Sequence, residues 1–192
     1  KVELYTNKST RVIENFPKLE YLDQPTSNIR RTKDSIIYHG HLAPERGIQD
    51  LVCAMKYASK SISSVSLSLL GAFRTEEFEY KIKSLIVDLG LESTITIFDQ
   101  VPHSEIWAII KEHSIGVIPF RRTPLTEENT PTKLFEMMTC GLEIVVSKLP
   151  PAQHFLNDSV HWCEPEDIHS ISNSIINACK MKDNFINVQK NF

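Results

Sequence analysis

Residues 35–59, SIIYHGHLAPERGIQDLVCAMKYAS, predict a β-strand that runs through a short loop into a helix. The stretch opens on a short, largely apolar run that stops at Gly40. After Gly47 the apolar residues recur at the spacing of one helix face. A strand followed directly by a helix is the first half of a βαβ unit.

The same alternation continues along the chain as far as residue 180. Further strands are expected at 65–70, 94–98, 115–120, 143–147 and 160–163. Further helices are expected at 76–89, 104–112, 132–139 and 165–180, with a short helical turn near 152–156. Strands that alternate with helices in this way predict an α/β fold, namely a doubly wound parallel sheet of the Rossmann-like kind.

Residues 1–33 do not share this alternation. They end in a polar run that contains Pro25 and the pair Arg30-Arg31, which is typical of a linker. We interpret 1–33 as the end of a preceding domain plus an interdomain linker, 34–182 as the Rossmann-like domain and 183–192 as a C-terminal tail. Because the chain begins at Lys1 without an initiator Met, we expect it to be a part of a longer protein.

The composition is that of an ordinary globular protein. Of 192 residues, 41% are hydrophobic and 23% are charged, which excludes a disordered or fibrous chain. The net charge of −3 gives no overall nucleic-acid footprint. The four cysteines form no C-x-x-C pair and are expected to be free thiols in a reducing compartment. No apolar stretch approaches the roughly 20 residues of a membrane-spanning helix.

Two cations are expected at the edge of the sheet where the strands end, which is where open α/β sheets bind ligands. Arg46 lies beside the start of one helix, and Lys133 lies in the first turn of another. Thr130 is expected to cap that second helix and Pro131 to take its first helical position. A cation at a helix N-terminus is unfavourable unless an anion is present, so the pair predicts a pyrophosphate site. Two solvated surface cations are the alternative that these residues leave open.

Two glutamates accompany the cations. Glu136 stands among apolar residues one and a half turns into its helix, and Glu128 precedes it by eight positions. Such carboxylates could accept hydrogen bonds from the hydroxyls of a sugar nucleotide, or Glu136 could belong to the polar stripe of an amphipathic helix. There is no G-x-x-x-x-G-K-S/T loop, no G-x-G-x-x-G loop and no G-x-S-x-G elbow to favour another chemistry.

Two further sets of residues have more than one interpretation. His39 and His41 alternate at the end of a strand, which is a spacing that metal-binding pairs use, but no third ligand is near in the sequence. A structural or phosphate-facing role is therefore favoured, and no metal site is predicted. The basic pairs Arg30-Arg31 and Arg121-Arg122 are interpreted as solvated, with contact to an anionic membrane as the alternative.

Several of these stretches together resemble a known family. Glu128 and Glu136, followed by MMTCG and IVVS, resemble the E-x₇-E signature of the family-four retaining glycosyltransferases with the GT-B fold. Residues 38–47 resemble the family's "VGRL-PEKG" phosphate loop, and 12–17 resemble the stretch that leaves the N-terminal domain. Weaker landmarks follow in the family's order at 69–71, 97–101 and 115–119. The resemblance runs from about residue 36 to residue 180.

The resemblance implies a role for each matching position. Glu128 would lie at the catalytic centre against the donor hexose, and Glu136 would bind the ribose. Arg46 would hold the pyrophosphate, together with backbone N–H groups of Thr132 and Lys133. The other implied donor-binding residues are Gly40, His41 and Gly71 in the loops, and Gln100 and Val101 near the base.

The resemblance also implies the function. The domain would bind a nucleoside-diphosphate sugar, and the whole enzyme would transfer the glycosyl group with retention to an acceptor glycan or lipid-linked sugar held by the N-terminal domain. No metal or other cofactor is expected. The setting would be polysaccharide or glycoconjugate biosynthesis in the cytoplasm, with contact at the inner face of a membrane left open, and the present chain alone would be inactive.

Three residues depart from the family pattern. His41 stands in place of an Arg, Gln100 in place of a Gly and Glu143 in place of a Pro. The first makes one phosphate contact neutral or dependent on pH. A non-catalytic module that binds nucleotide sugars is therefore one alternative. A nucleotide-sugar epimerase of the GT-B type is another, although the two glutamates argue against it.

Overall fold

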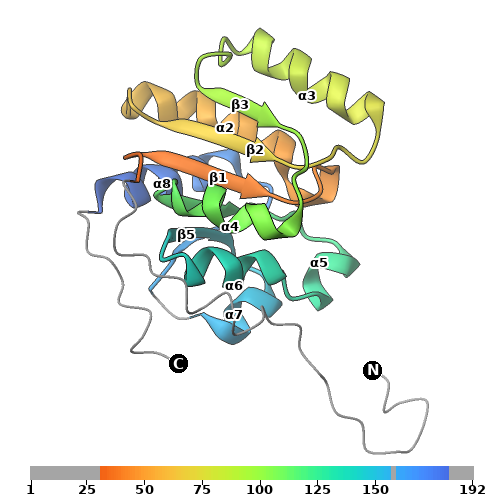
Figure 1. Cartoon of the computed structure of the whole chain (residues 1–192), viewed down its shortest axis with the longest axis vertical. Coiled ribbons are helices and arrows are strands. Elements are labelled where there is room, and N and C mark those ends of the chain that lie inside the picture. Colours follow the sequence, from red (N-terminus) through yellow and green to blue (C-terminus); the bar gives the residue numbers. More distant parts are fainter. Residues whose placement is uncertain (1–30, 157–158, 182–192) are drawn as a thin grey trace, which may run out of the picture.

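A computed structural model describes residues 31–156 and 159–181 of the chain (Figure 1). These residues form one six-stranded sheet in the order β3-β2-β1-β4-β5-β6, and every neighbouring pair is parallel. The strands are β1 (Ser35–His39), β2 (Ser66–Leu70), β3 (Ile95–Phe98), β4 (Ile115–Ile118), β5 (Glu143–Ser147) and β6 (His161–Cys163). The predicted parallel α/β sheet is confirmed. The tail, the stretch 12–17 and all but the last three residues of the linker lie outside the described residues.

Helices connect the strands on both faces of the sheet. They are η2 (Pro44–Arg46), α2 (Ile48–Ser61), α3 (Glu76–Asp88), α4 (His103–Lys111), α5 (Pro124–Glu128), α6 (Thr132–Thr139), α7 (Pro150–Phe155) and α8 (Ile168–Lys180). α2 and α8 pack together on one face, whereas α4 and α6 lie on the other (Figure 1). The chain winds outward from β1 to β3 and then returns to β4, so the switch point lies between β1 and β4. The sequence did not predict η2 and α5, which are short.

Arg31 and Arg121 were predicted to be solvated, but both form hydrogen bonds within the protein. The Arg121 guanidinium, just after β4, donates to both carboxylate oxygens of Asp50 in the first turn of α2, at 2.6 Å each. Asp50 is buried, and its hydrogen bonds raise the pKa of Arg121. Arg31 instead donates to the carbonyl oxygens of Gly141 and Cys140, which end α6. The prediction was wrong for both residues because their partners are far away in the sequence.

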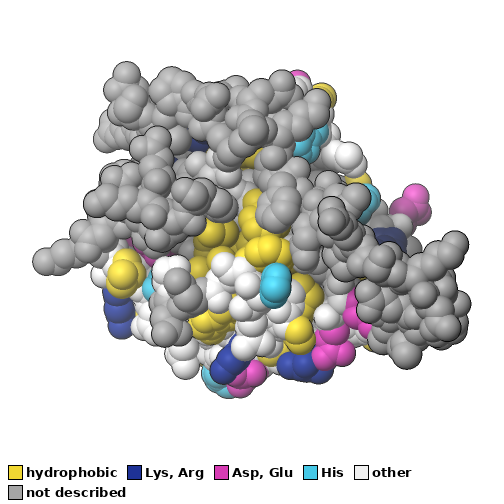
Figure 2. Space-filling model, turned by 90° about the horizontal axis from the view of Figure 1, so that it is seen from below, with side chains coloured by type: hydrophobic (Ala, Val, Ile, Leu, Met, Phe, Trp, Pro, Cys, Tyr) yellow, Lys and Arg dark blue, Asp and Glu magenta, His cyan; other side chains and the backbone are white. Residues whose placement is uncertain are grey.

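The described surface seen in Figure 2, from the side of α7, has no patch of one charge. Apolar side chains gather at its centre, and Lys and Arg side chains lie next to Asp and Glu side chains at its rim. Among the described residues, Arg122 pairs with Glu127 at 2.6 Å. In the described part of the chain, no helix is long and apolar enough to cross a membrane.

We expect Arg121→Ala to lower the free energy of unfolding by about 2 kcal/mol, because it leaves the Asp50 carboxylate buried without its bidentate partner. The neighbouring exposed pair provides the control, since Arg122→Ala should cost less than about 0.5 kcal/mol. Urea unfolding of both variants measures the difference. Equal losses in the two variants would show that the Asp50–Arg121 pair contributes no more to stability than an exposed ion pair does.

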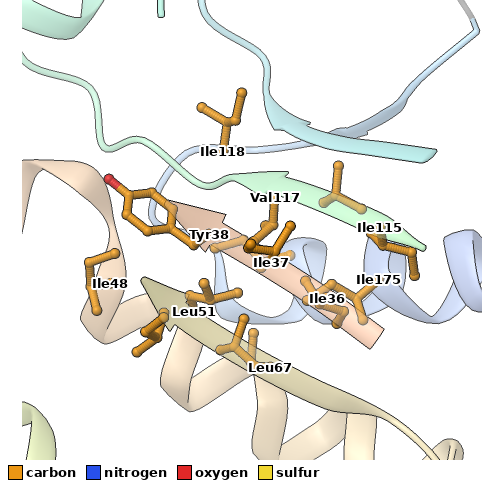
Figure 3. Packing of buried hydrophobic residues seen from close by; sticks show 14 of the residues in the cluster. Ile36, Ile37, Tyr38, Ile48, Leu51, Leu67, Ile115, Val117, Ile118 and Ile175 are labelled. Carbon is orange, nitrogen blue, oxygen red and sulfur yellow. The ribbon is translucent and has the colours of Figure 1, made fainter. Parts of the chain in front are cut away.

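The core lies on both faces of β1, whose five residues are all buried. Figure 3 shows Ile36 and Ile37 of β1 packed among residues from the neighbouring elements, including Leu51 and Val117. A strand that is covered on both faces reads as a continuous apolar run, which is why the sequence revealed it. Tyr38 ends the run, and Figure 3 shows its hydroxyl pointing out of the cluster.

The cysteines are free in this structure. Cys140 and Cys163 are buried, and Cys53 and Cys179 are half-buried. Burial raises the pKa of all four thiols above the ordinary value. The prediction of free thiols is therefore confirmed, and in this state they are poor nucleophiles.

Candidate functional site

Two glycines bring the ends of β1 and β2 close together. Gly40 and Gly71 have φ values of 104° and 147°, which residues with a side chain rarely adopt. The Gly40 N–H donates to the Leu70 carbonyl at 2.9 Å. A Cβ atom on Gly71 would lie only 2.0 Å from the Gly40 carbonyl oxygen. The loop after β2 can therefore approach the loop after β1 so closely because Gly71 has no side chain.

Arg46 lies at the start of α2, as predicted. It ends η2, and Gly47 then caps α2 in the left-handed conformation, with φ of 69°. The Arg46 guanidinium carbon lies 4.6 Å from the centre of the Phe120 ring, and Nε lies 3.8 Å from a Glu45 carboxylate oxygen. The same Glu45 oxygen also forms an ion pair with Arg74, so it is shared between two cations. The Arg46 charge is thus held in place but only partly neutralised.

The start of α6 differs from the prediction by one residue. Pro131, rather than Thr130, is the N-cap, and Thr132 is the first helical residue. The backbone of Pro131 is extended, with ψ of 109°, and no side chain caps the helix. Thr132 and Lys133 therefore occupy the first turn, where N–H groups have no acceptor within the helix.

The Lys133 ammonium reaches from α6 toward the end of β1. Nζ donates to the Tyr38 hydroxyl at 2.9 Å and lies 4.0 Å from the centre of the Tyr38 ring. It is also 5.4 Å from the centre of the Phe120 ring, on which Arg46 packs. A Cβ atom on Gly40 would be 2.9 Å from Nζ. The two predicted cations thus meet over one aromatic ring, and the ammonium of Lys133 is enclosed rather than solvated.

The Lys133 charge is poorly compensated. Among the described residues, no carboxylate oxygen forms an ion pair with Nζ. Burial, and then the like charge of Arg46, lower the pKa of Lys133 to about 7, although Glu136 opposes this shift. A buried ammonium beside a second cation is a strong site for an anion.

Glu136 is buried, so it does not belong to an exposed polar stripe. Only 7% of the residue is exposed. Its Oε1 lies 2.9 Å from Nε2 of His103, and its Oε2 lies 3.3 Å from Nε2 of His39. Burial, with contributions from Lys133 and His103, lowers the pKa of His39 to about 3, so this imidazole is neutral at physiological pH. His103 was not predicted to belong to the site, and its position at the start of an expected helix was the only signal for it in the sequence.

Other predicted site residues lie in different surroundings. Glu128 is exposed at the end of α5, so the two glutamates lie on separate helices. His41 is exposed while His39 is buried, and the His41 carbonyl accepts from the Tyr38 hydroxyl at 2.9 Å. Within 31–156 and 159–181, no three His, Cys, Asp or Glu side chains gather as a metal site. Between β3 and α4, Gln100 is exposed and Val101 is half-buried.

Comparison with known families gives one match over most of the chain. The family described as "Glycosyl transferases group 1" matches residues 22–191. No curated protein matches the chain.

Several solved structures share the fold. HepE of Anabaena, in complex with UDP and glucose, has 18% identity and a TM-score of 0.68 over 78% of this chain and 39% of its own. A TarM mutant of S. aureus, in complex with Fondaparinux, alpha-GlcNAc-glycerol and UDP, has 15% identity and a TM-score of 0.77 over 94% of this chain and 34% of its own. The catalytic domain of cholesterol-alpha-glucosyltransferase from Helicobacter pylori has 23% identity and a TM-score of 0.63 over 77% of this chain and 86% of its own. The present chain thus spans well under half of the first two proteins.

Proposed function

This chain belongs to the group 1 glycosyltransferases and has the fold of one half of a GT-B enzyme, and on that premise we propose that its site binds a nucleoside-diphosphate sugar as the glycosyl donor. The observation that carries the proposal is the pair of cations, Arg46 and Lys133, held over the Phe120 ring. A pyrophosphate supplies the negative charge that this pair lacks. HepE has been solved with UDP and with UDP-glucose, so UDP is the natural probe.

The site can hold the pyrophosphate through both its charge and its shape. Arg46 and Lys133 provide the positive charge, and the first turn of α6 adds N–H groups of Thr132 and Lys133. Gly40 and Gly71 leave the loops bare, so a phosphate can approach the backbone. As the bond to the sugar breaks, negative charge grows on the departing phosphate, and the same fixed cations stabilise it.

Lys133 also accounts for a departure from the family pattern. His41 occupies the position where the family has an Arg, and it is exposed. We assign the second phosphate-binding cation of this chain to Lys133, which reaches Gly40 from the opposite side of the site. The cation then comes from α6 instead of from the loop after β1.

The remaining parts of the donor follow from the residues around the cations. Glu136 would accept hydrogen bonds from the ribose hydroxyls, and Glu128 would contact the sugar. The base would lie near Gln100 and Val101, after β3. Transfer would retain the anomeric configuration, and the acceptor, a glycan or a lipid-linked sugar, would be bound by a second domain. This half alone would bind the donor but transfer no sugar.

Titration calorimetry with UDP tests the proposal. We expect the chain to bind UDP and expect Arg46→Ala and Glu136→Ala each to weaken binding at least about tenfold, since each removes a charged hydrogen-bonding partner. Arg122→Ala, which removes an exposed cation elsewhere, should leave the affinity unchanged. Absence of binding to UDP and to every other nucleoside diphosphate would contradict the proposal.

A binding module without transferase activity is the second candidate, and the exposed His41 at the family's Arg position is the observation that favours it. The two functions differ in one measurable respect. A longer protein that contains this chain should release UDP from UDP-sugar in the presence of acceptor if it is a transferase. A binding module would hold the donor without turnover.

A further inference from the structure

The Glu136 carboxylate lies between two imidazoles, and the nearer one, His103, is hydrogen-bonded to it. The carboxylate belongs to α6, in which Leu134, Phe135 and Met137 are buried as well. A glutamate has several rotatable bonds, so a carboxylate that must meet a ligand in one orientation needs fixed partners. Here Oε1 faces Nε2 of His103 on α4 at 2.9 Å, and Oε2 faces Nε2 of His39 on β1 at 3.3 Å.

His39 contributes a buried nitrogen that makes no hydrogen bond in the described part of the chain. Only 3% of the residue is exposed, and Nε2 has no hydrogen-bond partner among the described residues. The imidazole is neutral because burial lowers its pKa to about 3. Since a carboxylate oxygen faces Nε2, the tautomer with the proton on Nε2 is favoured, and at 3.3 Å the contact is longer than a good hydrogen bond. A hydroxyl that donates to Glu136 and accepts from this N–H would satisfy both groups.

His103 holds the other oxygen from the open side. It is the first residue of α4, and 56% of its side chain is exposed. Its ring packs edge-on against Trp107, with 6.1 Å between the ring centres, so the imidazole has a support besides Glu136. It also follows Val101 and Pro102 directly, on the side of the site where we propose that the base lies.

We infer that His39 and His103 are positioning residues that orient the Glu136 carboxylate toward the ribose hydroxyls of the donor. This inference rests on the proposed function, because it takes UDP binding at this site as given. The two imidazoles differ in exposure, come from different elements and converge on one carboxylate. Their effect is on hydroxyl recognition, whereas the pyrophosphate is held separately by Arg46 and Lys133.

Comparing UDP with 2′,3′-dideoxy-UDP in titration calorimetry tests this inference, with inorganic pyrophosphate as a third ligand. We expect His103→Ala and His39→Val each to weaken UDP binding about tenfold and to leave the affinities for dideoxy-UDP and pyrophosphate unchanged. In these variants the ratio of the affinity for UDP to the affinity for dideoxy-UDP should therefore fall toward one. His103→Gln, which keeps an N–H donor, should restore part of the preference.

A second histidine–glutamate pair provides the matched control. His161 lies 3.2 Å from Glu143, at the opposite edge of the sheet where β5 begins. His161→Ala should leave all three affinities unchanged. Thermal unfolding shows whether the buried substitution His39→Val keeps the fold. If it does not, the positioning role is judged from the exposed substitution His103→Ala alone.

The possible outcomes separate the two proposals. An unchanged preference for UDP over dideoxy-UDP in His103→Ala would overturn the positioning role. Equal binding of the two nucleotides by the unmodified chain would overturn it as well, while leaving the pyrophosphate site intact. Failure of the unmodified chain to bind UDP at all would instead count against the proposed function.

Discussion

Replacing Lys133 by Met should weaken the binding of UDP about a hundredfold at neutral pH, or about 2.8 kcal/mol. The ammonium is enclosed next to Tyr38 and Gly40 and has no carboxylate partner among the described residues, so water and protein screen it little. Met has a similar length and removes the charge without leaving a large void. Titration calorimetry at constant ionic strength measures the loss.

The same substitution should raise the stability of the unliganded chain. Burial lowers the pKa of Lys133 from 10.5 to about 7, so the unfolded chain binds more protons than the folded chain between these values. Stability of the unmodified chain therefore increases with pH across this window, and it is lowest below about pH 7, where the buried ammonium is charged. Lys133→Met should unfold at a higher temperature than the unmodified chain near pH 7, and the gap should narrow toward pH 10.

UDP binding should be coupled to protonation of Lys133. A bound pyrophosphate raises the pKa of Lys133, which is about 7 without it. Above about pH 7 the chain should therefore take up close to one proton when it binds UDP. The affinity for UDP should then fall up to about tenfold for each unit by which the pH rises. Calorimetry between about pH 7.5 and 9, where the UDP phosphates are already ionised, and in buffers of different ionisation enthalpy, counts that proton. Arginine stays protonated in this pH range, so the Lys133→Arg variant should bind UDP without taking up a proton. The His103→Ala variant should still take up the proton, because it retains Lys133. Uptake that persists in Lys133→Met would refute the assignment.

Replacing Gly47 by Ala should lower the free energy of unfolding by about 3 kcal/mol, the largest stability effect that we predict. Gly47 caps α2 with φ of 69°, and a Cβ atom there would lie 1.7 Å from the Pro119 carbonyl oxygen. The backbone at Pro119 must therefore move, and it leads directly into Phe120, which supports both cations. The midpoint of thermal unfolding should fall by about 10 °C, and UDP binding should be lost with it.

Gly90 separates the cost of the backbone conformation from the cost of the clash. Its φ of 65° is nearly that of Gly47, but a Cβ atom there would have nothing within 4 Å. Gly90→Ala should therefore cost only about 1 kcal/mol and leave UDP binding intact. If Gly47→Ala and Gly90→Ala were equally destabilising, the close approach of Pro119 to Gly47 would have no energetic weight.

Much of the fold was readable from local pattern. The run that became β1 is buried over its whole length, and each predicted strand and long helix lies within a few residues of its expected place. Errors were confined to short or terminal features. The helices η2 and α5 are too short to show periodicity, and the cap of α6 moved from Thr130 to Pro131.

The positions of the two cations were also predictable, but their surroundings were not. Arg46 and Lys133 follow strands that end at the same edge of a parallel sheet, so the topology alone brings them near each other. The basic residues Arg31 and Arg121 carried no such signal. Their partners, the end of α6 and Asp50, lie 71 or more positions away in the chain.

The sequence by itself determined the order of strands and helices, the parallel sheet and the sheet edge at which Arg46 and Lys133 lie, because these depend on periodicity and on short-range loop chemistry. Only the tertiary structure decided the burial, the partners and the pKa of each site residue. Lys133 meets Tyr38 across 95 positions, and Glu136 meets His103 across 33. Desolvation and charge coupling act through space. The lowered pKa of Lys133 and the contacts of His39 and His103 with Glu136 therefore arise only once these segments are packed together.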